Sequence, residues 1–428
     1  DLLWPNLSNL ELFNRNFEIS KTQDLYYRRY AGQYFRGERV PCLDEPATWD
    51  EEGNLVMTLQ EDGTMREGYV WVTPYWAPET QIKMCALGAQ ESLQGQDGTD
   101  CHTSGGYKSV GCGCGPNLMW CEYKLNQTLL SAMVEDVDRR IRAHLAKDEP
   151  YMELLTNTSA YVNGPLAYYL KNLTFQNRTI KMTPLAISNE QIPDMDVRDS
   201  ETWVEIDLPP YHSGLLTSPA FLLRFQTNRA RATQYYTKFL CQPFKAPSGG
   251  LPPVHPDDVL VTDLQVRSGC SYCHANLEPA ASYWGRWLEV GAGFRKEAEY
   301  PEFNEDCFSC ATTSSNCSNH CKNYYVVKAA NESEEPYFGW LKPFLFRADE
   351  HMKFINEGPR MLVMRTTVDN RMPLCLTRNL TSWLIGRDLY EDEEEWLFEA
   401  TTNALQSGMK LRQAVKEVLM SDLYRRVQ

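Results

Sequence analysis

The 428-residue sequence contains no apolar run long enough to cross a membrane, which takes about 18 uncharged apolar residues. Its longest candidate, residues 212–223, is too short and contains Ser, Thr and Pro. Basic residues are also scarce, with 42 Lys and Arg against 57 Asp and Glu and a formal net charge of −15. Nucleic-acid phosphates and anionic lipids both require basic surface. We therefore predict neither an integral membrane protein nor a nucleic-acid partner.

Common catalytic signatures are missing as well. The sequence has no Gly-x-Ser-x-Gly, no phosphate-binding loop and no dinucleotide fingerprint. Asp194, Asp196 and Asp199 lack the Gly and the closing Glu of an EF-hand calcium loop. What is present is a chain that is 43% hydrophobic and long enough for two or three domains with a large core.

Cysteine, by contrast, is abundant, with 14 residues in clusters. Apart from Cys270 and Cys273, twelve remain, enough for up to six disulfides. Disulfides in that number require an oxidising compartment, so we predict a secreted protein of the periplasm, the outer surface or the extracellular space. The sequence begins at Asp1 and not at Met, so we expect a removed leader or a start within a longer chain. Sequons that fit a secretory route stand at Asn6, Asn126, Asn157, Asn172, Asn177, Asn316, Asn331 and Asn379.

The most specific local signature is Cys270-Ser-Tyr-Cys273-His274. A two-residue gap on a helical turn spaces two thiols to match the two vinyl groups of one porphyrin, and the adjacent His points its imidazole at the iron. We predict one covalent haem c, with Cys270 and Cys273 as its anchors and His274 as the proximal iron ligand. The alternative is a disulfide or redox-active Cys-x-x-Cys followed by an incidental His.

The sixth iron ligand has several candidates. We favour Met372, which precedes Pro373, because a Met-Pro pair supplies the distal sulfur in many small c-type cytochromes. A Met ligand would raise the redox potential and a second His would lower it. The competitors are His351, Met352, His255, His212 and His320, although such residues more often serve as satisfied polar groups or core fillers. An empty sixth position would allow peroxide chemistry.

The remaining cysteines pose a choice between metal and disulfides. Four thiolates at the spacing of Cys307, Cys310, Cys317 and Cys321 could hold structural zinc, but an oxidising compartment favours two disulfides. Cys241 and Cys375 lie outside both clusters, so we predict a long-range bridge between them. The six cysteines within residues 1–125 lack paired Cys-x-x-Cys units, and we expect disulfides there too.

The apolar periodicity predicts a mainly α protein. We expect helices at 126–147, 164–170, 219–240, 391–406 and 410–425, and a strand at 68–73. The predicted domains are a disulfide-rich, irregular and β-containing region 1–125, a helical domain 126–256 that ends in a Pro-rich connector, and a helical, cytochrome c-like haem domain 257–428. The last one includes an acidic, Cys-rich insertion at about 296–337 and flanking C-terminal helices.

Over roughly residues 126–428 the chain resembles the secreted haem c proteins of planctomycetes and myxobacteria, whose domains are of unknown function. The resemblance is carried by four blocks, at 151–167, 212–244, 270–279 and 374–426. It implies a mainly helical c-type cytochrome exported before haem attachment, with Cys270, Cys273 and His274 as haem residues. It implies no reaction, and it does not extend to residues 1–125 or to the insertion at 307–321.

Three functions are compatible with these observations. The first is electron transfer by a mono-haem cytochrome that exchanges electrons with other redox proteins or with subunits of a cytochrome-containing complex, within a larger redox or surface assembly. The second is a haem peroxidase or an oxidoreductase subunit. The third is a structural surface-assembly protein in which the haem is secondary. The absence of another catalytic constellation favours the electron-transfer protein over a stand-alone enzyme.

Overall fold

The computed structural model describes residues 18–22, 26–29, 42–101, 109, 111–123, 127–172, 189–251, 253, 255, 261–289, 292–313, 315–329, 332–342 and 349–427. They belong to two compact units. One holds the described residues of 136–160 and 207–428, and the other those of 6–135 and 161–206. The three domains expected from the sequence stay a prediction.

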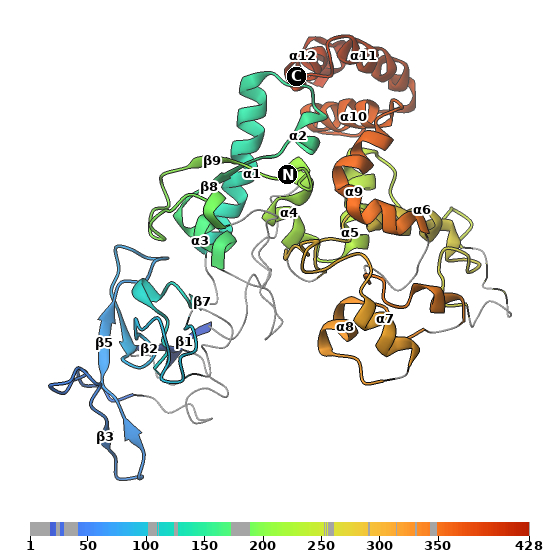
Figure 1. Cartoon of the computed structure of the whole chain (residues 1–428). Coiled ribbons are helices and arrows are strands. Elements are labelled where there is room, and N and C mark those ends of the chain that lie inside the picture. Colours follow the sequence, from blue (N-terminus) through green and yellow to red (C-terminus); the bar gives the residue numbers. More distant parts are fainter. Residues whose placement is uncertain are drawn as a thin grey trace. The chain divides into compact units, whose positions relative to one another are not determined.

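The unit that contains most of the N-terminal region is built on a five-stranded sheet in the order β5-β6-β2-β1-β7 (Figure 1). Its strands are β1 (Glu18–Thr22), β2 (Tyr26–Arg29), β5 (Tyr69–Val72), β6 (Ile82–Cys85) and β7 (Glu122–Tyr123). β1–β2 and β5–β6 pair antiparallel, whereas β1–β7 and β2–β6 pair parallel. The strand predicted at 68–73 is β5, where Val70 and Val72 pack on the core and Trp71 between them is 56% exposed. A small hairpin, β3 (Thr58–Leu59) and β4 (Met65–Arg66), adds a second sheet.

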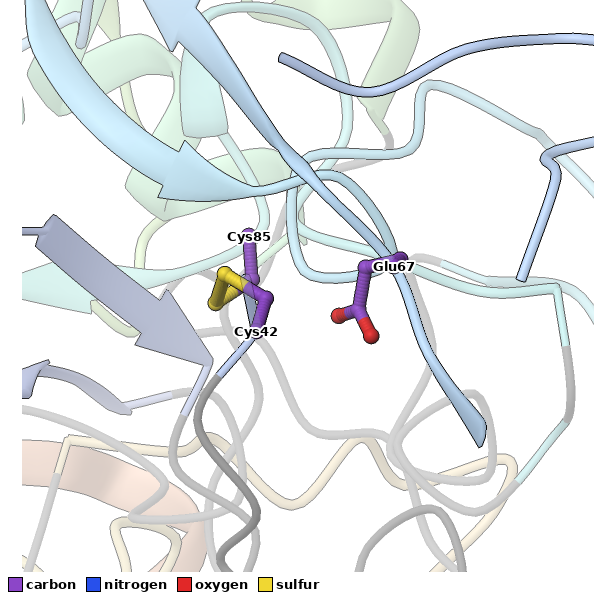
Figure 2. A group of neighbouring side chains, drawn as sticks. All are labelled: Cys42, Glu67 and Cys85. Atoms are coloured by element: carbon purple, nitrogen blue, oxygen red, sulfur yellow. A yellow bond between two sulfur atoms is a disulfide. The ribbon is translucent and has the colours of Figure 1, made fainter. Parts of the chain in front are cut away.

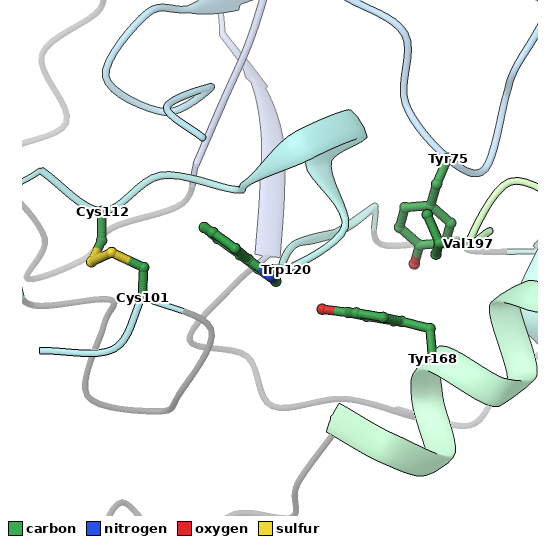
Figure 3. Close-up of a cluster of buried hydrophobic side chains, with 6 residues drawn as sticks. All are labelled: Tyr75, Cys101, Cys112, Trp120, Tyr168 and Val197. Carbon is green, nitrogen blue, oxygen red and sulfur yellow. A yellow bond between two sulfur atoms is a disulfide. The ribbon is translucent and has the colours of Figure 1, made fainter. Parts of the chain in front are cut away.

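Disulfides and aromatic rings fill the core of this unit. Its three bridges are Cys42–Cys85, Cys101–Cys112 and Cys114–Cys121. Figure 3 shows the Cys101–Cys112 bridge in one cluster with Trp120, Tyr75 and, from α3 (Gly164–Asn172), Tyr168. Buried disulfides thus take the place of a larger apolar core, as is usual where short strands enclose little volume.

The other unit is helical, which agrees with the mainly α class expected from the sequence (Figure 1). Its helices include the C-terminal part of α1 (Gln127–Lys147), then α2 (Glu153–Thr156), α4 (Pro219–Arg224), α5 (Asn228–Phe239), α6 (Ser271–Ser282), α7 (Glu305–Thr312), α8 (Asn319–Tyr324), α9 (Asp349–Thr366), α10 (Arg371–Ile385), α11 (Glu394–Gln406), α12 (Leu411–Met420) and α13 (Asp422–Val427). A further two-stranded sheet pairs β8 (Ser159–Val162) with β9 (Val204–Asp207), and most of its residues belong to the unit that contains most of the N-terminal region. α6 packs on α5 and α9, while α10 packs on α5, α11, α12 and α13.

The helix predicted at 219–240 is broken into α4 and α5. The Thr227 hydroxyl caps α5 by accepting a hydrogen bond from the Ala230 amide, and Phe225 leaves helical geometry. The fully buried Arg231 donates hydrogen bonds to the carbonyl oxygens of Phe225, Leu222 and Leu288, and therefore satisfies acceptors near the break. The periodicity of the sequence did not reveal this tertiary partner.

The Cys-rich insertion is a helical hairpin. α7 and α8 are joined by the nested disulfides Cys307–Cys321 and Cys310–Cys317. Isolated β-bridges, Phe303 with Trp340 and Tyr325 with Leu341, close its base. The C-terminal pair predicted at 391–406 and 410–425 corresponds to α11 and α12, but α12 ends at Met420, and α13 begins at Asp422 after the C-cap Ser421.

Candidate functional site

All fourteen cysteines are described, and only Cys270 and Cys273 are free. The other twelve form six disulfides. The bridge predicted between Cys241 and Cys375 is present and ties the end of α5 to α10. The 307–321 cluster forms two disulfides, so it offers no thiolates to a zinc ion. The only unpaired thiols are therefore the two of the predicted haem motif.

The predicted haem motif forms the first turn of α6. The Gly269 backbone is left-handed, with φ of 76°, and Cys270 is the N-cap of the helix. The amides of Cys273 and His274 both donate to the Cys270 carbonyl, at 3.2 and 3.1 Å. The two cysteines and His274 are half-buried. This is the helical turn that two thioethers to one porphyrin require.

His274 is held by a buried carboxylate. Its Nδ1 donates a hydrogen bond to Glu278 Oε1 at 2.5 Å, one helical turn further along α6. Arg229 of α5 places its Nε 2.8 Å from the same oxygen. The Glu278 side chain is 0% exposed, against 23% for His274 and 33% for Arg229. Because Nδ1 is engaged, Nε2 is the ring atom that would bind iron.

These residues fit a haem c group. Two free thiols lie three residues apart on one turn, and the adjacent imidazole has its orientation fixed by a carboxylate, as is usual for metal-binding His. Cys270 and Cys273 would hold the porphyrin and His274 the iron. The sequence pointed to these three residues but not to Glu278 and Arg229. The four-residue spacing of His274 and Glu278 on a helix was the available signal for the first.

The favoured distal candidate, Met372, is buried in the first turn of α10, a helix that packs on α5, α11, α12 and α13. The haem-motif helix α6 packs on α5 and α9, so α5 is the neighbour that α6 and α10 share. Met372 stays a prediction.

Its competitors lie in several places. His351 and Met352 are buried on α9, which packs directly on α6. The His255 amide donates to Ser268 Oγ at 2.7 Å, two residues before Cys270. His320 lies among tyrosine rings of the insertion.

His212 has the most buried environment of these histidines. It is 0% exposed and makes an edge contact with the Trp287 ring, with centroids 5.8 Å apart. Burial, together with the nearby Arg140 charge, lowers the pKa of His212 to about 3. The imidazole is therefore neutral at ordinary pH, inside an aromatic core.

One other group of potential metal ligands occurs among the described residues. Cys42, Cys85 and the Glu67 carboxylate lie together in the sheet unit. Figure 2 shows that the two sulfurs are bonded to each other. Because disulfide sulfurs are not thiolate ligands, the group offers a single carboxylate and does not constitute a metal site.

The six disulfides indicate an oxidising compartment outside the cytoplasm. In the described part of the chain, no helix has the length and apolar character that a membrane crossing requires. Among the predicted sequons, Asn316 and Asn379 are exposed and Asn157 is half-buried. Asn6, Asn126, Asn177 and Asn331 lie outside the described residues.

Comparisons with protein-family models, with curated proteins and with solved structures each found no match to this chain. The family resemblance of the haem region therefore stays a prediction.

Proposed function

We propose that this protein is an exported mono-haem c-type cytochrome that transfers electrons. The observation that carries the proposal is the state of the motif: its two thiols are the only free ones of fourteen, and the Nδ1 of its His is anchored to a buried carboxylate. Bound haem would supply one-electron redox chemistry. The chain's own residues would tether it through Cys270 and Cys273 and hold the His274 ring in one orientation.

The exposure of the motif supports exchange of electrons with another protein. Tyr272, between the two cysteines, is 54% exposed, and both cysteines are half-buried. The tethered side of a haem would therefore be accessible from solvent. The net charge of −15 can steer a redox partner with a basic surface. We propose as partners other redox proteins or subunits of a cytochrome-containing complex in the periplasm, at the outer surface or outside the cell.

The carboxylate on His274 favours a haem peroxidase as the second candidate. A carboxylate that accepts the Nδ1 proton makes the imidazole a more basic ligand. A more basic proximal ligand stabilises oxidised iron, which suits peroxide reduction if the sixth position is open. The distal side decides between the two functions.

Absorption spectra of the purified haem-loaded protein separate the two functions. An electron carrier with a protein distal ligand gives a six-coordinate, low-spin haem in both oxidation states and reacts slowly with peroxide. A five-coordinate, high-spin resting haem that reacts rapidly with peroxide would instead establish the peroxidase.

The same spectra test Met372. Replacement Met372→Leu nearly conserves volume and should cost less than about 1.5 kcal/mol of stability. If Met372 is the distal ligand, the variant becomes high-spin, whereas the control Met352→Leu stays low-spin. An unchanged low-spin spectrum in Met372→Leu would exclude Met372.

A further inference from the structure

One carboxylate oxygen is shared by a histidine and an arginine. Glu278 Oε1 accepts the hydrogen bond from His274 Nδ1 at 2.5 Å and lies 2.8 Å from Arg229 Nε. The carboxylate is fully buried, so water does not screen its charge as it would at the surface. Glu278 therefore interacts with two donors that compete for the same lone pairs.

The packing of two helices fixes this arrangement. Glu278 and His274 are four residues apart on α6, which places them on the same face. Arg229 reaches them from the first turn of α5, and α5 packs directly on α6. Neighbouring Ala280 and Ala281 are buried as well, which leaves Glu278 little freedom to turn away. The hydrogen bond is thus built into the fold and does not depend on a mobile side chain.

The Glu278 carboxylate and the Arg229 guanidinium have opposite effects on a metal bound at His274 Nε2. The carboxylate draws the Nδ1 proton, which increases the electron density at Nε2 and stabilises oxidised iron. Arg229 draws electron density from the same oxygen and adds a positive charge nearby, which weakens that effect. Redox potentials of haem respond to hydrogen bonding of the axial ligand and to local charge.

We propose that Glu278 and Arg229 are positioning residues that set the redox potential of the haem in opposite directions. Glu278 lowers the potential through the His274 hydrogen bond, and Arg229 limits how far it falls. The proposal rests on the proposed haem c function and goes beyond it, because it assigns the control of the potential to two residues outside the haem motif.

The test is a spectroelectrochemical titration of the haem-loaded full chain and its variants. In Glu278→Gln the amide accepts a weaker, uncharged hydrogen bond, so the reduced-to-oxidised ratio at fixed ambient potential should rise about tenfold, or ~59 mV for one electron. In Arg229→Gln the ratio should fall. Glu394 of α11 forms a similar ion pair with Arg378 of α10. Glu394→Gln is therefore the matched control, and its potential should be unchanged.

A charge effect and a hydrogen-bond effect are separated by Glu278→Asp, which keeps the charge and shortens the reach. A raised potential in this variant supports the hydrogen bond as the cause, and a wild-type potential contradicts it. If Glu278→Gln does not fold, the fall expected for the half-exposed Arg229→Gln decides alone. Haem-loaded variants that share the potential of the control overturn the inference. Absence of covalent haem from the wild-type protein overturns the proposed function instead.

Discussion

The chain contains two Cys-x-x-Cys pairs, each within the first turns of a short helix, with opposite outcomes. Cys307 and Cys310 on α7 are both oxidised, each bonded to a different cysteine at or near the start of α8. Cys270 and Cys273 at the start of α6 are both free. The spacing is the same, so spacing alone does not decide the chemistry. The two pairs differ in that the α7 pair is bonded to two further cysteines, whereas the α6 pair is followed by His274.

The side chains around the two Cys-x-x-Cys pairs also differ. Beside the α7 pair, Asn304 caps the helix by accepting a hydrogen bond from the Cys307 amide, and the nested bridges make a small structural hairpin. Beside the α6 pair, His274 is anchored to a buried carboxylate that is also paired with an arginine. Buried charges are costly unless paired, and at the α6 pair both partners of the buried Glu278 are in place.

The largest expected effect is the loss of covalent haem when the α6 cysteines are replaced, but not when cysteines of the insertion are replaced. The double variant Cys270→Ser/Cys273→Ser should retain no haem after denaturation, because no thioether can form. The matched variant Cys310→Ser/Cys317→Ser should keep a full complement. Haem retention is measured on denaturing gels stained for haem. Equal retention by both variants would mean that the comparison between the pairs is wrong.

The next effect concerns stability and compares bridges of different loop length. Cys241–Cys375 closes a loop with a sequence separation of 134, and Cys310–Cys317 one of 7. Chain-entropy arguments assign about 5 kcal/mol to the long loop and about 2 kcal/mol to the short one. Replacement of each pair by Ala, followed by urea unfolding, should show the larger loss for Cys241–Cys375. The reverse order would show that native-state geometry outweighs loop length.

The smallest effect compares two histidines of the helical unit. Burial lowers the pKa of His212 to about 3 in the folded chain. Below about pH 6.5 the imidazole therefore binds a proton in the unfolded chain and stays neutral in the folded one. Protonation of the unfolded chain at this histidine does not affect the free energy of unfolding above about pH 6.5. It lowers that free energy by about 1.4 kcal/mol per pH unit as the pH falls from about 6.5 towards 3.

Unfolding free energies at pH 7, 6 and 5 check this slope. His212→Gln should reduce it by that amount, whereas His255→Gln, at an exposed position, should retain it. An equal slope in wild type and His212→Gln would contradict the assignment.

Sequence reasoning predicted the elements whose signal is local. Helix periodicity located α1, α3, α11 and α12, and alternation located β5. Elimination among cysteines predicted the bridge between Cys241 and Cys375, while the nested order within 307–321 required the fold of the hairpin. The break between α4 and α5 escaped prediction because its carbonyls are satisfied by Arg231, whose side chain folds back only in the tertiary structure.

The residues of the candidate site also separate into those with a local sequence signal and those that only tertiary packing brings together. Cys270, Cys273 and His274 lie within five consecutive residues and were predicted, and Glu278 lies one turn away on the same helix. Arg229 comes from a helix more than forty residues earlier, and only the packing of α5 on α6 brings it to Glu278. A distal ligand is a tertiary feature of the same kind, so the Met-Pro pair at Met372 stays a prediction.

The most direct test of covalent haem at α6 is a pyridine haemochrome spectrum combined with intact mass. It is made on protein produced with the machinery for c-type haem attachment. We predict one haem per chain, six disulfides and no free thiol, because the two free cysteines become thioethers. A chain of haem-free mass, with Cys270 and Cys273 as thiols or as a seventh disulfide, would contradict the assignment.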